Sequence, residues 1–86
     1  MKLCIISEFT CDFSDYETMI ETNREKVMQW CSEMILAKVD NHKCIMVADV
    51  TDLAGLQAHM STPEMEQWDK DNGCVDKVFI MEPAST

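Results

Sequence analysis

The sequence predicts an α+β fold whose elements follow the order β-α-β-β-α-β. Three observations carry this prediction: an apolar strand-like segment begins the chain, a long amphipathic stretch follows it, and the same order returns in shortened form after a tight hairpin. This element order is typical of a four-stranded antiparallel sheet with both helices on one face. We expect the strands to lie side by side in the order fourth, first, third, second.

The first half of the chain divides into a strand over residues 3–9 and a helix over residues 14–34. Ser14 and Glu17 have the spacing of a capping box, in which each residue satisfies an amide of the first helical turn. Apolar residues then recur with the helical period and predict the buried side of the helix. They are Tyr16, Ile20, Val27, Trp30, Cys31 and Met34.

The second half begins with a hairpin of strands over residues 35–39 and 44–50, whose turn holds Asp40 and Asn41. These residue types tolerate the positive φ that many tight turns require.

After the hairpin, single residues predict where helices begin and end. Asp52 is expected to cap a short helix over residues 53–60, which restarts at Pro63 because proline suits a first helical position. Gly73 is expected to end it in the left-handed conformation. A strand over residues 74–81 and a polar tail over residues 82–86 complete a single domain of residues 1–86.

The predicted strands are apolar on both faces. Leu3 and Ile5 alternate with Cys4 and Ile6, and the third and fourth strands show the same two-sided pattern. A sheet with helices on one face normally has a polar second face, and soluble monomers rarely expose an apolar patch of this size. We therefore predict a homodimer that pairs sheet to sheet and buries Ile5 or Ile45.

The composition and charge of the chain argue against two classes of binding partner, nucleic acids and anionic membranes. The 86 residues carry a formal net charge of −9, and the seven basic residues are scattered singly. A chain without a basic cluster is a poor match for nucleic acid or for an anionic membrane surface. Its apolar start is too short for a signal peptide, and no run approaches the length of a membrane span. We expect a cytoplasmic protein.

The five cysteines predict neither a metal site nor a disulfide. Their number is odd and no two have the Cys-x-x-Cys spacing. Four lie in apolar segments, where a reduced cysteine packs as a small hydrophobic residue, and Cys11 lies at a strand end beside an acidic residue. No glycine-rich phosphate loop is present, so we expect no cofactor. The acidic pairs Glu64/Glu66 and Asp69/Asp71 are expected to form a solvated helix surface.

Residues 47–65 resemble a known family. There a strand ends, a short helix begins, and Ser61-Thr62-Pro63-Glu64 starts the next turn, as in the dimeric α+β barrels. These ferredoxin-like domains include the antibiotic-biosynthesis-monooxygenase-like and stress-responsive barrel proteins. The chain is also similar, at residues 63–65, 68–69 and 73–75, to a small cyanobacterial family of unknown function. The narrower resemblance implies no activity.

The broader resemblance implies three roles: cofactor-free oxygenation, haem handling, or small-ligand binding between sheet and helices. The residues that would carry such chemistry are His59, Trp68, Trp30, Tyr16 and Asp49. Each has a plainer interpretation, because a functional histidine needs an orienting partner, large aromatic residues are more often core, and an aspartate at a strand end often caps locally. His42 lies in the hairpin turn and is expected to be solvated.

Two function hypotheses follow. The first, which we favour, is a non-enzymatic homodimeric domain that binds a small apolar ligand or a partner. The second is a cofactor-independent monooxygenase or isomerase acting on an apolar or aromatic compound. An enzyme needs convergent polar groups with perturbed pKa values inside a cavity, whereas a binding protein can use a pocket lined by apolar side chains alone.

Overall fold

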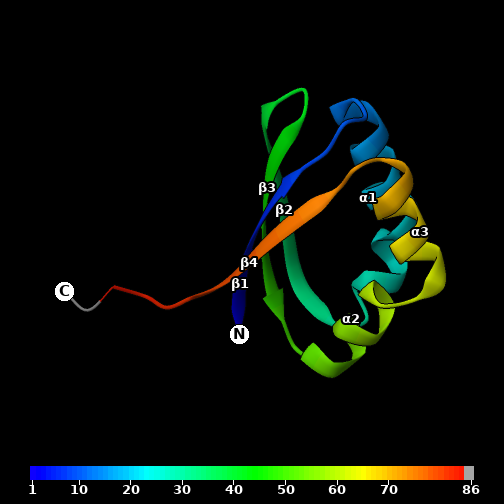
Figure 1. Cartoon of the computed structure of the whole chain (residues 1–86). Coiled ribbons are helices and arrows are strands. Elements are labelled where there is room, and N and C mark those ends of the chain that lie inside the picture. The colour runs from blue at the N-terminus through cyan, green and yellow to red at the C-terminus, as the bar shows by residue number, and fades with distance from the viewer. Residues whose placement is uncertain (85–86) are drawn as a thin grey trace.

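A computed structural model of the protein describes residues 1–84. Its elements are β1 (Lys2–Glu8), α1 (Phe13–Val27), β2 (Cys31–Asp40), β3 (Lys43–Val50), α2 (Leu53–Met60), α3 (Pro63–Asp71) and β4 (Val75–Met81). The strands form one antiparallel sheet, and the three helices lie against the same face of it (Figure 1). The predicted α+β, ferredoxin-like fold is confirmed.

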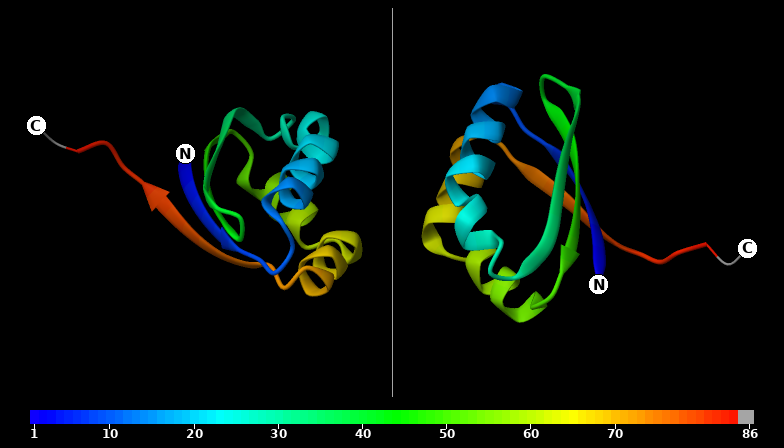
Figure 2. Two further views of the ribbon diagram at one scale, coloured as in Figure 1. Left: turned by 90° about the horizontal axis from the view of Figure 1, so that it is seen from above. Right: turned by 180° about the vertical axis from the view of Figure 1, so that it is seen from behind.

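The strand order in the sheet is β2-β3-β1-β4, as the sequence predicts. The two central strands pair along their whole lengths, from Lys2 opposite Asp49 to Glu8 opposite Lys43. Viewed from above, the sheet curves around the helical layer, and β4 runs away from that layer toward the C-terminus (Figure 2). The inward side of the sheet is therefore well covered near β3 and β1 and poorly covered at the end of β4.

The first helix ends seven residues earlier than predicted. It ends at Val27, and the Met28 and Trp30 amides close the last turn by donating to Arg24 and Val27 carbonyls. Trp30, Cys31 and Met34 are therefore not helical. Residues from Cys31 onward pair with β3, Cys31 lying opposite Val50 and Met34 opposite Ala48. No glycine or proline lies at the end of the helix. Pairing of the following residues with β3, rather than a local sequence signal, therefore ends it.

The predicted capping box at Ser14 and Glu17 is also wrong. The N-cap is Asp12, two residues before Ser14, and the Asp15 carboxylate accepts from the Asp12 amide at 3.3 Å. The Asp12 carboxylate accepts instead from the Asn41 side chain at 2.9 Å. The hairpin turn and the start of α1 are thereby joined.

The hairpin itself forms as predicted, but without positive φ. Among the described residues only Gly73 has a positive φ, at 58°. The turn is held instead by Asp40, whose carboxylate accepts from the His42 amide at 2.7 Å. An irregularity in register between Lys38 and Asp40 accommodates this geometry.

The second helical region is broken where the sequence predicts. The Asp52 carboxylate accepts from the Gly55 amide at 3.0 Å and caps α2, and Thr62 caps α3, with Pro63 at its first position. Gly73 adopts the left-handed conformation after α3, also as predicted.

Strand register assigns the two faces of the sheet. Leu3, Ser7 and the β3 residues Cys44, Met46, Ala48 and Val50 point toward the helices and are buried. Ile5 shares that inward face, whereas Ile45 lies on the outward face opposite Ile6. Of the two positions predicted for a dimer interface, the structure leaves Ile45 on the open side.

Two further expectations concern the ends and the membrane. Within the described residues, no helix has both the length and the apolar character needed to cross a bilayer. The polar tail is described only as far as Ala84, so Ser85 and Thr86 lie outside the described residues.

Candidate functional site

A cavity of about 70 Å³ lies between the helices and the inward face of the sheet. A single water needs roughly 10–15 Å³ of such space, so the cavity as it stands has room for several waters. An organic ligand would require the flexible methionine side chains of the wall to shift. Its wall is almost entirely apolar. The apolar lining residues include Ile5, Met19, Ile20, Val27, Met34, Met46, Ala48, Leu56, Met60 and Met65.

The cavity touches both parts of a divided core. One buried cluster contains Leu3, Ala48 and Leu56, and the other contains Phe9 and Tyr16. Ala48, Leu56 and Tyr16 also line the cavity. Methionines supply much of the wall between them, and their flexible side chains can adapt to ligands of different shapes.

His59 is the most unusual polar residue of the cavity. It lies on α2, only 6% of it is exposed, and both ring nitrogens lack a hydrogen-bond partner. Buried polar atoms are seldom left unpaired, and an unpaired group calls for an explanation. Burial, and next the charge of Lys26, lower the pKa of His59, so its ring is neutral near pH 7.

Trp30 packs against this histidine and is not among the residues that line the cavity. The Trp30 and His59 ring centroids are 5.5 Å apart, with a tilt of 35°. Behind the indole stands Gly55, where a Cβ atom would overlap Trp30. The glycine of α2 thus makes room for the tryptophan that contacts His59.

Tyr16 occupies the other end of the cavity within an aromatic group. It stacks on Phe9 at 4.8 Å and meets the edge of Trp68 at 5.9 Å. Its hydroxyl lies 3.2 Å from the Ser7 hydroxyl, and burial strongly raises its pKa, so the phenol stays protonated. Trp68 packs behind Tyr16 and lines a surface depression rather than the cavity.

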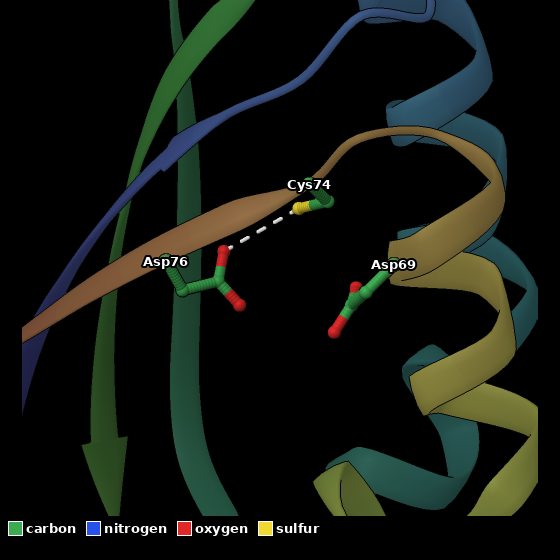
Figure 3. Close-up of side chains that lie close together, drawn as sticks. All are labelled: Asp69, Cys74 and Asp76. Carbon is green, nitrogen blue, oxygen red and sulfur yellow. Dashed lines mark hydrogen bonds between the residues drawn. The ribbon is translucent and has the colours of Figure 1, made fainter.

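Asp69, Cys74 and Asp76 form a polar cluster at the cavity wall (Figure 3). Their ligand atoms all lie within 4.8 Å of one another. Asp76 accepts from Ser7 at 2.6 Å and from the Cys74 thiol at 3.5 Å. Because the Ser7 hydroxyl donates its hydrogen bond to Asp76, its oxygen accepts from the Tyr16 hydroxyl, which links the phenol to the cluster.

The cluster shifts the ionisation of its members. Burial, and next the Asp76 carboxylate, raise the pKa of Asp69 above its ordinary value. Burial and the two carboxylates likewise raise the pKa of Cys74 strongly, so its thiol is protonated. The expectation that Asp69 belongs to a solvated helix surface is therefore wrong, although Glu64, Glu66 and Asp71 are exposed as predicted.

Asp49 lies away from this site. It is on the outward face of β3, opposite Lys2 and Glu33, and its carboxylate is 3.5 Å from the N-terminal amine. His42 is exposed in the hairpin turn, as predicted, with Nδ1 2.9 Å from the Cys11 carbonyl oxygen. Among the five candidate residues, the structure thus brings His59 and Tyr16 to the cavity and Trp30 and Trp68 behind them.

Sequence reasoning missed Asp69 and Asp76. A signal for Asp76 was present, because it shares the register of Val78 and Ile80 and so must point to the helix side of the sheet. Asp69 gave no such signal, since its neighbours in α3 are mostly polar.

The outward face of the sheet forms an apolar surface that no described helix covers. Ile35 is 52% exposed and Phe79 is 50% exposed. Register places both on this face beside Cys4, Ile6, Ile45 and Val47. We refer to these six residues as the open face.

Comparison with known proteins identifies the fold. A candidate antibiotic biosynthesis monooxygenase from Deinococcus radiodurans has a TM-score of 0.63 and 9% identity, covering 100% of this chain and 97% of that one. SnoaB, a cofactor-independent oxygenase from Streptomyces nogalater, has a TM-score of 0.62 and 10% identity, covering 96% of this chain and 95% of that one. The chain has their fold.

Comparison of sequences, in contrast, does not assign the chain to a family. No protein-family model matches the chain, and no curated protein matches it. The structural similarity agrees with the resemblance to antibiotic-biosynthesis-monooxygenase-like proteins, and the cyanobacterial family stays a prediction.

Proposed function

We propose that this chain is a homodimeric protein that binds a small apolar ligand in the cavity beneath its helices. The observation that carries the proposal is the cavity itself, an apolar chamber with the unpaired imidazole of His59 in its wall. Ligand pockets of this kind combine an apolar lining with a few polar groups that fix orientation. A ligand hydroxyl would supply the partner that His59 lacks.

The homodimer belongs to the same proposal. The open face would meet the open face of a second copy, leaving the helices and the cavity on the outside of the assembly. These six outward residues carry no charge and suit the apolar centre of such an interface, at whose edge Lys77 lies opposite Ile6. The cavity would remain accessible in the dimer.

The proposal is tested by calorimetric titration with para-ethylphenol, a neutral aromatic compound with one hydroxyl. We expect saturable binding that weakens at least tenfold, about 1.4 kcal/mol, in His59→Ala. The matched control is His42→Ala, which removes an exposed imidazole and should leave the affinity unchanged. Absence of binding by the wild type, or equal effects of the two substitutions, would refute this assignment of the cavity.

A second candidate is cofactor-independent oxygenation, and the observation favouring it is again His59. A neutral imidazole with free nitrogens in an apolar cavity can accept a proton from a bound ligand. SnoaB, which has the same fold, is described as a cofactor-independent oxygenase. Oxygen consumption with an electron-rich phenol, abolished in His59→Ala and retained in His42→Ala, would favour this function over simple binding.

A further inference from the structure

The cavity has an acidic end. Asp69 reaches it from α3 and Asp76 from β4, and the two side chains approach one another across the space between helix and strand (Figure 3). Neither residue forms an ion pair among the described residues. Two carboxylates held this close repel each other unless a proton or a cation lies between them.

The rest of the wall provides no counter-charge. Among the described residues that line the cavity there is no lysine and no arginine. The whole chain adds to this field, with 16 acidic and seven basic residues. An anionic ligand would be repelled from the cavity, and a cationic group would be attracted to its acidic end.

A second, independent observation is the unpaired imidazole of His59. His59 is 6% exposed, lines the same cavity, and has no hydrogen-bond partner on either nitrogen. It lies on α2, whereas the carboxylates come from α3 and β4. The cavity therefore joins a neutral, unpaired imidazole with a pair of carboxylates from other elements.

We propose that the cavity binds a small aromatic amine, with its ammonium group between Asp69 and Asp76 and a hydroxyl at His59. This inference rests on the proposed ligand-binding function and specifies the class of ligand. The ammonium donates to both carboxylates and neutralises their repulsion, the hydroxyl pairs with the imidazole, and the aromatic ring contacts the methionine and leucine wall. The imidazole thereby gains a hydrogen-bond partner, and the two carboxylates gain a counter-charge.

An organic cation fits the cluster better than a metal ion. Hard divalent cations require about six oxygen ligands, whereas this wall offers two carboxylates within an apolar surround. A zinc ion would need the Cys74 thiolate, and burial together with the two carboxylates raises the pKa of that thiol strongly, which opposes thiolate formation. The ammonium group uses the carboxylates as they stand.

Three matched probes test the proposal: tyramine, para-ethylphenol and phloretate, which carry a positive, a neutral and a negative side group on the same phenol. Calorimetric titration at pH 7 should give at least tenfold tighter binding of tyramine than of para-ethylphenol, and the weakest binding for phloretate. Asp69→Asn and Asp76→Asn should each remove most of the tyramine preference while para-ethylphenol still binds. Glu66→Gln, which removes an exposed carboxylate from the same helix, is the matched control and should retain it.

The outcomes separate this inference from the function on which it rests. Equal affinity for tyramine and para-ethylphenol, or a preference that survives both asparagine variants, overturns the amine inference and leaves ligand binding intact. Stoichiometric zinc binding that blocks tyramine and is lost in Cys74→Ser also overturns it, in favour of a metal site. If none of the three probes binds, the proposed function fails and the amine inference fails with it.

Discussion

The two faces of the sheet are both apolar, but they differ in what they lack. The inward face is covered by three helices except toward the end of β4, where Val78 and Ile80 are exposed. It encloses a cavity with an unpaired histidine and two neighbouring carboxylates. The open face contains no charged residue among its six members and has no cover within the described chain. We therefore propose a small ligand for the first face and a second copy of the chain for the open face.

The difference follows from the alternation of the strands. Inward positions of β1 and β4 include Ser7 and Asp76, which are hydrogen-bonded to each other at 2.6 Å. Outward positions nearby hold Cys4, Ile6 and Phe79. Buried polar groups require hydrogen-bond partners, so they can select among ligands that enter the cavity. An apolar outer surface requires only that water be excluded, which is not directional.

The largest expected effect tests the open face. Ile45→Glu places a charge at the centre of the proposed interface and should convert a dimer to a monomer at micromolar concentration, because an unpaired buried charge costs several kcal/mol. Light scattering behind a sizing column measures the mass. Met28→Glu, at an exposed methionine in the helical layer, is the control and should stay dimeric. A wild-type monomer would refute the assembly.

The second-largest expected effect tests the close contact between Gly55 and Trp30 in the helical layer. Gly55→Ala should lower the stability by about 1–3 kcal/mol, which is about 5–20 °C in Tm, because the new methyl group overlaps the Trp30 indole. Helix propensity alone predicts the opposite sign, a gain of up to about 1 kcal/mol. Thermal unfolding at fixed protein concentration measures the change.

Ala58→Gly in the same helix is the matched control. Ala58 is exposed, so removing its methyl group changes only the helix propensity at that position. It should cost about 1 kcal/mol. An unchanged or higher Tm for Gly55→Ala would show that Trp30 moves freely and that His59 is not held in place by it.

The local features of this fold were predictable because their causes are local. Asp52, Pro63 and Gly73 act on amides or on backbone conformation within a few residues, and each does so where the sequence predicts. The end of α1 has a different cause, since Cys31 and Met34 satisfy a helical period but pair with β3. Sheet pairing is decided by residues far along the chain, so the helical pattern alone could not give the boundary.

The site was only partly predictable for the same reason. Tyr16 and His59 lie on helix faces that the apolar period indicates, and both reach the cavity. The contact of Asp69 with Asp76 joins a helix to a strand, and no spacing in the sequence encodes it. The cavity itself depends on how side chains from three helices and the sheet fill the space between them.

A third effect concerns pH and the unpaired histidine. Burial lowers the pKa of His59 in the folded protein, so the unfolded chain takes up its proton first as the pH falls. The contribution of His59 to stability is therefore present above its ordinary pKa of 6.5 and is lost progressively as the pH falls below that value toward the folded pKa. Tm measured across this range should fall less in His59→Met than in the wild type.

The control for this pH effect is His42→Gln, because that imidazole is exposed in the hairpin turn. It should leave the slope of Tm against pH as it is in the wild type. Equal slopes for wild type and His59→Met would mean that His59 is hydrated or paired in solution, and the cavity would then need no polar ligand group at that position.

The smallest expected effect concerns Asp69 at the acidic end of the cavity. Its contribution to stability changes with pH in the direction opposite to that of His59. The raised pKa of Asp69 means that its carboxyl group stabilises the fold only while protonated, below its ordinary value of 3.8, and that this contribution is lost as the pH rises through the folded pKa. At pH 7 the ionised group should destabilise the empty protein, and Asp69→Asn should raise Tm by about 2–4 °C, or about 0.5 kcal/mol, since partial exposure screens the repulsion. Glu66→Gln should leave Tm nearly unchanged. The gain should vanish when tyramine saturates the wild type, because the ammonium then supplies the counter-charge that asparagine makes unnecessary; a gain that persists with bound amine would place the ligand elsewhere.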